Sequence, residues 1–171
     1  MKFFWIICIF VLNIYASALD FKTLECNFTQ TITNDENSTI TYTGSFYATN
    51  RNRALWIYKT PVEKKVYFKN KKVAIFEPEL EQVIITTLKN SPNITQIIKE
   101  AKQISKNQYS TIFDDTQYFI KTKDGKISSI NYKDKLENRV KITLNNVETN
   151  TILDDALFEI SIPKDFDIVT Q

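Results

Sequence analysis

Hydrophobic and polar residues alternate along most of this 171-residue chain. Between residues 38 and 49, every second residue is apolar or glycine, and the residues between them are mostly threonine and serine. A period of two over this length is typical of a β-strand with one dry face and one wet face. The same alternation occurs at Cys26, Phe28 and Ile32; at Val140, Ile142 and Leu144; and at Phe158, Ile160 and Ile162.

Shorter β-type segments fill most of the remaining chain. Residues 123–126 (Lys-Asp-Gly-Lys) and 69–71 (Lys-Asn-Lys) are typical of the turns between antiparallel strands. We therefore predict about ten short strands in a mainly β (α+β) fold, an antiparallel sheet or barrel. The further strands are expected at residues 53–59, 65–68, 73–76, 82–88, 109–113, 116–122 and 127–132.

One segment has a helical period instead. Ser91 and Pro92 form a typical helix start, an N-cap residue followed by proline at the first helical position. Apolar residues then recur at helical spacing, with charged and polar residues on the opposite side. This predicts an amphipathic helix of about three to four turns. We expect it to lie across the apolar face of the sheet, contributing Ile94, Ile97, Ile98, Ala101 and Ile104.

The first eighteen residues have the features of a cleavable export signal. Lys2 precedes an apolar stretch at residues 3–15, and Ala16-Ser17-Ala18 matches the small-x-small cleavage pattern. The stretch is too short to span a bilayer core of roughly 30 Å as a helix. We therefore expect residues 1–18 to be removed and residues 19–171 to form a single exported domain.

Composition excludes several classes of function. Without Lys2, 21 Lys and Arg face 20 Asp and Glu, and a net charge of +1 gives no reason to expect a nucleic-acid partner. Cys8 leaves with the signal, so Cys26 has no intramolecular disulfide partner, and we expect it to be a buried hydrophobe.

The sequence contains few side chains of the kinds that catalysis requires. The chain contains no histidine, so Ser-His-Asp and Cys-His catalysis are excluded. Its two glycines cannot build a phosphate-binding loop or a dinucleotide fingerprint, and we predict no cofactor and no metal site. Carboxylate pairs such as Asp114-Asp115 and Asp154-Asp155 leave a small secreted hydrolase as an alternative. The pattern favours a carrier of apolar ligands over an enzyme.

A set of residues in fixed order resembles one known family. Phe28-Thr29-Gln30 is followed by Gly44, by Trp56, by Thr60-Pro61 and by a Pro-Glu-Leu-Glu-Gln segment at residues 78–82. The ending from Phe158 through Pro163 to Asp167 also fits. Together they resemble the outer-membrane lipoprotein carrier proteins, the LolA family, over the whole chain after residue 18.

The resemblance implies an incomplete antiparallel β-barrel with a helical lid over an apolar cavity. It also implies a monomeric periplasmic chaperone that accepts acylated lipoproteins from an inner-membrane ABC transporter and passes them to an outer-membrane receptor. The residues are also compatible with an alternative function, a generic periplasmic carrier of free lipid. The receptor itself shares the fold, but no lipidation site precedes Cys26.

The cavity is expected to be lined by apolar side chains of the sheet and of the lid helix. Both faces of residues 54–58 are apolar, so the pattern leaves open which face meets the ligand. The candidate lipid-binding residues are Phe28, Tyr42, Phe46, Trp56, Tyr58, Ile94, Ile97, Ile98 and Ala101.

Two departures from the family concern the lid. The family's lid-closing arginine falls on Asn50 by spacing, so Arg51 or Arg53 is the candidate to take its role. The family's N-terminal lid helix is nearly absent, because only residues 19–24 precede the first predicted strand. We expect a thinner and more easily opened lid.

Overall fold

The computed structural model describes residues 19–87 and 94–170. The expected export signal and the expected helix start at Ser91-Pro92 lie outside the described residues. In the described part, twelve strands form a single sheet. They are β1 (Thr23–Thr33), β2 (Thr39–Thr49), β3 (Arg53–Thr60), β4 (Lys64–Lys69), β5 (Lys72–Glu77), β6 (Gln82–Thr87), β7 (Lys102–Ser105), β8 (Gln108–Phe113), β9 (Thr116–Lys123), β10 (Lys126–Lys133), β11 (Arg139–Thr149) and β12 (Asp167–Thr170).

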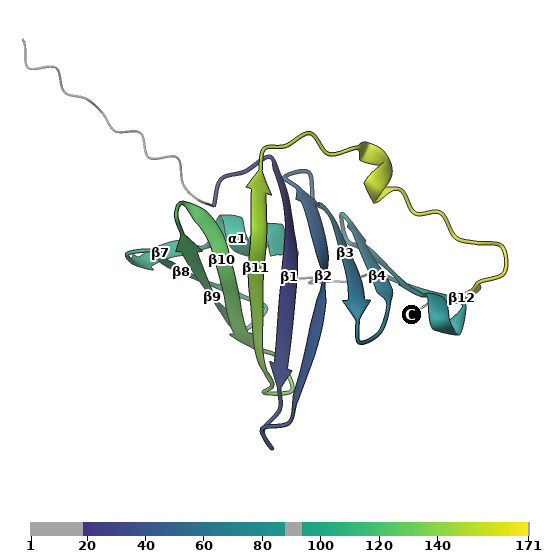
Figure 1. Ribbon diagram of the computed structural model, residues 1–171, viewed down its shortest axis with the longest axis horizontal. Coiled ribbons are helices and arrows are strands. Elements are labelled where there is room, and N and C mark those ends of the chain that lie inside the picture. Colours follow the sequence, from purple (N-terminus) through teal and green to yellow (C-terminus); the bar gives the residue numbers. More distant parts are fainter. Residues whose placement is uncertain (1–18, 88–93, 171) are drawn as a thin grey trace, which may run out of the picture.

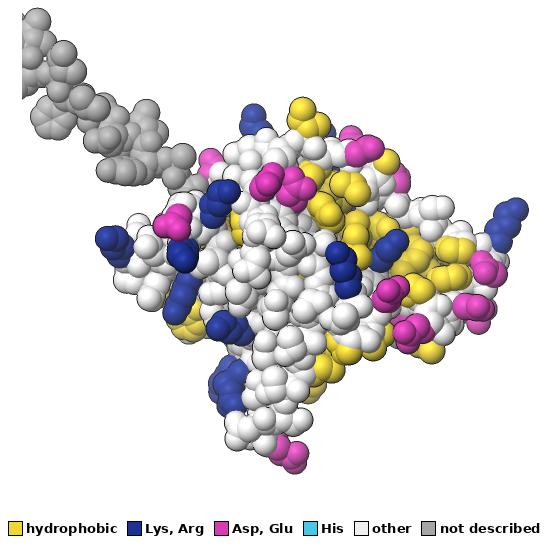
Figure 2. Space-filling view, in the orientation of Figure 1, with side chains coloured by type: hydrophobic (Ala, Val, Ile, Leu, Met, Phe, Trp, Pro, Cys, Tyr) yellow, Lys and Arg dark blue, Asp and Glu magenta, His cyan; other side chains and the backbone are white. Residues whose placement is uncertain are grey.

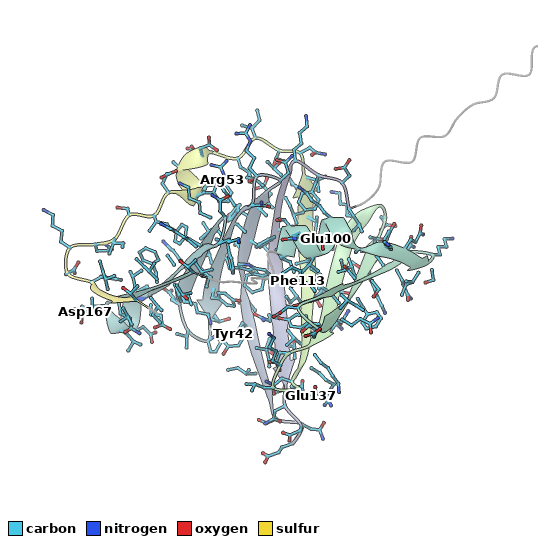
Figure 3. All side chains as sticks on the ribbon, turned by 180° about the vertical axis from the view of Figure 1, so that it is seen from behind. Tyr42, Arg53, Glu100, Phe113, Glu137 and Asp167 are labelled. Carbon is cyan, nitrogen blue, oxygen red and sulfur yellow. The ribbon has the colours of Figure 1, made fainter. Side chains whose placement is uncertain are left out.

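The sheet is open and strongly curled (Figure 1). Its strand order is β12-β6-β5-β4-β3-β2-β1-β11-β10-β9-β8-β7, so β12 and β7 are its two edges. All pairs are antiparallel except β12, which runs parallel to β6. The single α-helix of the described residues, α1 (Ile94–Glu100), lies across the hollow face, in front of the strands when the molecule is seen from behind (Figure 3). The prediction of a mainly β fold shaped as an incomplete barrel is confirmed.

Alternation along each strand builds the core. On β1 the burial alternates strictly at first, with Leu24, Cys26 and Phe28 buried toward the hollow face. Their threonine-rich neighbours face the convex side. Ile97 and Ile98 of α1 close the core from the other side and are 1 % and 0 % exposed. The core therefore lies between the hollow face and α1.

The C-terminal segment covers part of the convex face. A short 3-10 helix, η2 (Asp155–Phe158), packs against β3, and Phe158 is only 2 % exposed. Ile162 and Phe166 further along pack on a second cluster formed by Ala74, Phe76 and Val83. Figure 2 shows hydrophobic side chains gathered on this half of the convex face. This layer explains why strand β3 is apolar on both faces.

Two elements differ from the sequence-based predictions. The helix ends at Glu100, and Ile104, which we expected on its apolar side, lies on β7 and is 56 % exposed. Residues 158–162 are not a strand, because they cross the convex face without a pairing partner. Phe158 and Ile162 pack on the underlying sheet, whereas Ile160 between them is 38 % exposed. No helix of the described residues is long and apolar enough to cross a bilayer.

Turn predictions hold at two hairpins. Asp124 and Gly125 both have positive φ, 51° and 74°, as a two-residue turn between β9 and β10 requires. Asn70 has φ of 59° between β4 and β5. A 3-10 turn, η1 (Pro78–Leu80), links β5 to β6.

Candidate lipid-binding cavity

An apolar cavity of about 210 Å³ lies between the hollow face of the sheet and α1. Strands from both halves of the sheet contribute to its wall, and α1 forms its roof. Most of the lining side chains are aromatic or aliphatic, with one amide among them. The lining residues are Gln30, Trp56, Tyr58, Val66, Phe68, Ile94, Ile97, Tyr118, Tyr132 and Ile142.

Aromatic rings pack edge to face along one wall. The ring centroid of Phe28 lies 4.9 Å from that of Trp56 and 5.1 Å from that of Tyr58, both in T-shaped geometry. The ring centroids of Phe46 and Trp56 are 4.2 Å apart. Such pairs are favourable beyond the area that they bury. The cluster places Trp56 and Tyr58 toward the cavity, so the even-numbered face of β3 is the one that meets it.

Gly44 makes room for this cluster. It pairs with Phe28 across β1 and β2, and a Cβ atom added at Gly44 would lie 2.8 Å from the Phe28 ring. The same atom would lie 2.0 Å from the backbone oxygen of Ile57. Glycine is therefore required here by close approach of a ring and a neighbouring strand.

The roof is thin and apolar on its lower side. Ile94 and Ile97 line the cavity, Ile98 is fully buried beside it, and Ala101 packs partly buried against the same core. On the outer side of α1, Lys99 Nζ donates to the backbone oxygen of Asn50 at 3.3 Å. This bond ties the helix to the turn between β2 and β3.

The nine candidate cavity residues take three positions. Trp56, Tyr58, Ile94 and Ile97 line the cavity. Phe28, Phe46, Ile98 and Ala101 pack in the core around it. Tyr42 is outside the lining but contacts Tyr58 edge to face at 5.7 Å, and Lys64 Nζ lies 4.5 Å above the Tyr58 ring and 5.2 Å above the Tyr42 ring. Contact of any of them with lipid stays a prediction.

Sequence reasoning missed six lining residues. Four of them lie on strands with alternating patterns: Val66, Phe68, Tyr118 and Ile142. The pattern could have predicted the face of the strand on which each lies, but not that each would lie opposite β3. Tyr132 required the curl of the sheet to reach the same cavity. Gln30 is polar, so an apolar pattern does not mark it as a lining residue.

The cavity carries no ionised group at neutral pH. Burial raises the pKa of Tyr58 and raises that of Tyr132 to about 12, with smaller contributions from neighbouring tyrosines. Nearby, burial raises the pKa of the Cys26 thiol to about 12, which keeps it neutral and unreactive. An uncharged, mostly apolar wall suits a ligand of hydrocarbon chains.

The two candidate lid arginines lie away from this roof. Arg53 Nη2 binds Asp155 Oδ1 at 2.5 Å, and its guanidinium lies 5.0 Å from the centre of the Phe158 ring (Figure 3 labels Arg53 beside η2). Arg53 therefore fastens the C-terminal segment. Arg51 is exposed, and its backbone N–H donates to Thr49 Oγ1 at 3.3 Å. In this structure, the polar contact between α1 and the β2–β3 turn comes from Lys99.

A larger open groove of about 1100 Å³ lies beside the β8–β9 turn and the β10–β11 loop, and Tyr132 lines both this groove and the cavity. Its lining includes Lys133, Arg139, Lys141 and the ion pair between Lys135 and Asp114. Charged, solvated walls do not favour acyl chains. Within residues 19–87 and 94–170, no cluster of His, Cys, Asp or Glu has the makings of a metal site.

A curled sheet with one hollow apolar face, roofed by a short helix and lacking catalytic groups at the cavity, defines a carrier of apolar ligands. Comparison with known proteins agrees with this class. Residues 20–120 match the family model described as "Outer membrane lipoprotein carrier protein LolA", and this range is more than half of the chain. The chain belongs to the LolA family.

Individual relatives extend the match to nearly the whole chain. It is 40% identical over 168 residues to an outer-membrane lipoprotein carrier protein of Campylobacter jejuni, covering 98% of each chain. It is 32% identical over 145 residues to the protein of the same name from Wolinella succinogenes, covering 84% of each. A solved DUF1329 family protein from Desulfovibrio piger shares the fold at 12% identity with a TM-score of 0.57, over 82% of this chain and 91% of that one. Family membership confirms the prediction of a carrier and not an enzyme.

Proposed function

We propose that this protein is a periplasmic chaperone that shelters the acyl chains of lipoproteins in the cavity beneath α1. The observation that carries the proposal is an apolar, uncharged cavity roofed by α1, of which the structure describes Ile94–Glu100. Exposing a sixteen-carbon chain to water costs on the order of 12 kcal/mol, at ~0.8 kcal/mol per methylene. A lipoprotein therefore needs such a shelter to cross an aqueous compartment.

Loading requires α1 to move. Pockets for drug-sized ligands hold roughly 300–1,000 Å³, whereas this cavity holds about 210 Å³ in the closed form. Lifting α1 would expose Ile94, Ile97 and Ile98, which costs roughly 1.5–3 kcal/mol for each side chain unless lipid covers them. Acyl chains that enter would take the place of these contacts. The same residues thus pack on the sheet when closed and on lipid when open.

The partners proposed are an inner-membrane lipoprotein-releasing ABC transporter as donor and an outer-membrane receptor as acceptor. We propose that the carrier acts as a monomer, since one chain contains the whole cavity and its roof. The proposed export signal at residues 1–18 would bring the chain to the periplasm.

The test uses inner-membrane vesicles that contain the transporter and a labelled lipoprotein, mixed with the protein after removal of residues 1–18. We expect label to enter the soluble fraction only with ATP, transporter and carrier together. Label that stays in the vesicles would contradict the proposal. Release of phospholipid in place of lipoprotein would instead support the alternative function, a generic carrier of lipid.

A matched pair of variants locates the activity in the cavity. Ile97→Glu places a carboxylate in the lining, and Gln96→Glu places the same charge on the exposed side of the same helix. Burying a carboxylate among acyl chains is costly, so we expect release to fall roughly tenfold or more for the first variant and to change little for the second. Equal release by both would exclude this cavity as the binding site.

A further inference from the structure

One polar side chain interrupts the apolar wall. Gln30 lies on the hollow side of β1, between Tyr42 on β2 and Ile142 on β11. It lines the cavity and is 9 % exposed. The neighbouring positions on the same side of β1, Phe28 and Ile32, are apolar. An aliphatic side chain at this position would pack as well as the amide does.

The amide is held in place by one hydrogen bond. Tyr58 donates its hydroxyl hydrogen to Gln30 Oε1 at 3.0 Å. Tyr58 itself is fixed by edge-to-face contact with Phe28 and by Lys64 above its ring. The orientation of Gln30 is therefore set by neighbours that are themselves packed. With Oε1 engaged by Tyr58, the Nε2 group keeps its two N–H donors for other acceptors.

Those donors have no protein acceptor. Within residues 19–87 and 94–170, Gln30 makes no side-chain hydrogen bond besides the one from Tyr58. Tyr132, across the cavity, also forms no side-chain hydrogen bond in the described part of the chain. Donors that line an apolar cavity and are not engaged by side chains of the described residues are available to a ligand that brings an acceptor.

We propose that Gln30 Nε2, with the Tyr132 hydroxyl as a second donor, binds an acyl carbonyl oxygen at the head of the lipid chains. This inference rests on the proposed function. Ester- and amide-linked chains end in a carbonyl, which is the only strong acceptor on an otherwise apolar ligand. One oriented donor inside an apolar wall would fix how deep the chains enter, as is usual for small-molecule sites. Tyr58 is a positioning residue that holds Gln30.

The test compares two ligands that differ only in these carbonyls. One is a dipalmitoyl-cysteinyl lipopeptide whose two chains are ester-linked, and the other is its analogue with each palmitoyl group replaced by an ether-linked hexadecyl group. Binding is followed by displacement of a fluorescent apolar dye and by Trp56 emission. For the wild type we expect roughly fivefold tighter binding of the acylated ligand, within the ~2- to 12-fold that one hydrogen bond gives.

Variants assign the preference to Gln30. In Gln30→Leu we expect the ratio of the two affinities to fall to about one while the hexadecyl analogue binds as before, which also shows that the variant is folded. Tyr58→Phe and Tyr132→Phe should lower the ratio in part. Tyr109→Phe is the matched control, because Tyr109 packs on the same core without lining the cavity, and it should keep the wild-type ratio.

Two outcomes overturn the inference separately. Equal affinity of the wild type for both ligands, or an unchanged ratio in Gln30→Leu, excludes carbonyl recognition while the carrier function stands. Failure of the wild type to bind either ligand refutes the proposed function, and the inference with it.

Discussion

The role of a single residue in this sheet depends on the group that lies opposite it. Gly44 faces the Phe28 ring, and Gln30 lines the cavity while accepting a hydrogen bond from Tyr58. Tyr132 and Cys26 are kept neutral because burial disfavours their charged forms. Each of these side chains is ordinary in the sequence, and each acquires its role from a neighbour on another strand.

Replacing Gly44 with alanine should destabilise the protein. The added Cβ would meet the backbone oxygen of Ile57, which can move only with its strand. We expect a loss of about 3 kcal/mol in the free energy of unfolding, at the upper end of typical overpacking costs, measured by urea denaturation. Thr41→Ala on the exposed side of the same strand should cost about 0.5 kcal/mol or less. Equal stability of Gly44→Ala and wild type would contradict the close approach.

The tyrosines of the cavity should make the fold sensitive to alkali. The pKa of Tyr132 is raised to about 12 in the folded protein and is about 10 when unfolded, so the unfolded chain loses its proton first. Stability from this group is complete below pH 10 and is lost as pH rises toward 12. In Tyr132→Phe the decline over this range should be shallower by up to about 1.4 kcal/mol per pH unit. Urea denaturation midpoints at pH 8, 10 and 11 measure this decline in stability. The same decline with pH in wild type and in Tyr132→Phe would refute the prediction.

At the scale of elements, α1 is the weakest part of the core. Isolated helices shorter than about 12–15 residues are marginal in water, so the seven described residues of α1 depend on their packing against the sheet. Three isoleucines supply that packing, and Lys99 adds a bond to Asn50. The helix is thus the element best suited to open without unfolding the sheet.

Amide hydrogen exchange should show this difference. We expect the amides of α1 to exchange faster than those of β1 and β11 in the ligand-free protein. Lys99→Ala should raise their exchange rate about two- to tenfold, since one exposed hydrogen bond is lost, while leaving the strands unchanged. Lys102→Ala, just beyond the helix, serves as control. Protection of α1 equal to that of β1 would contradict an easily opened lid.

At the scale of the whole molecule, the chain covers both faces of its sheet. The hollow face is closed by α1, and the convex face of β3–β6 is covered by residues 155–166 before β12 joins the edge at β6. Arg53 holds this segment through Asp155, and the guanidinium lowers the pKa of that carboxyl. The bond is therefore present above the usual titration range of aspartate and is lost when the pH falls through the lowered value.

Phe158→Ala tests the importance of the C-terminal segment. Phe158 is 2 % exposed, and its loss should cost about 3 kcal/mol, at the low end for a buried phenylalanine, because the segment can settle into the gap. Ile152→Ala is the matched control, since Ile152 is 99 % exposed in the same segment, and it should change the melting temperature little. Similar effects of both substitutions would mean that the segment does not stabilise the sheet.

Much of the architecture follows from local patterns. Alternation located β1, β2 and the hairpins through β11, and the turn residues at Asn70 and Gly125 separated them correctly. The same alternation failed at residues 158–162 and could not predict the four-residue edge strands β7 and β12. Short edge strands depend on whether a neighbour is present to pair with, and a local pattern carries no information about that neighbour.

The sequence alone determined which residues are apolar on each strand, that a helix would cover them, and that the familiar catalytic groups are missing. It did so because strand and helix periods are local properties of the chain. Only the tertiary structure decided which face of β3 meets the cavity, that Arg53 fastens the C-terminal segment, and that Gln30, Tyr58 and Tyr132 meet in one space. These depend on curling of the sheet, which brings together strands distant in sequence.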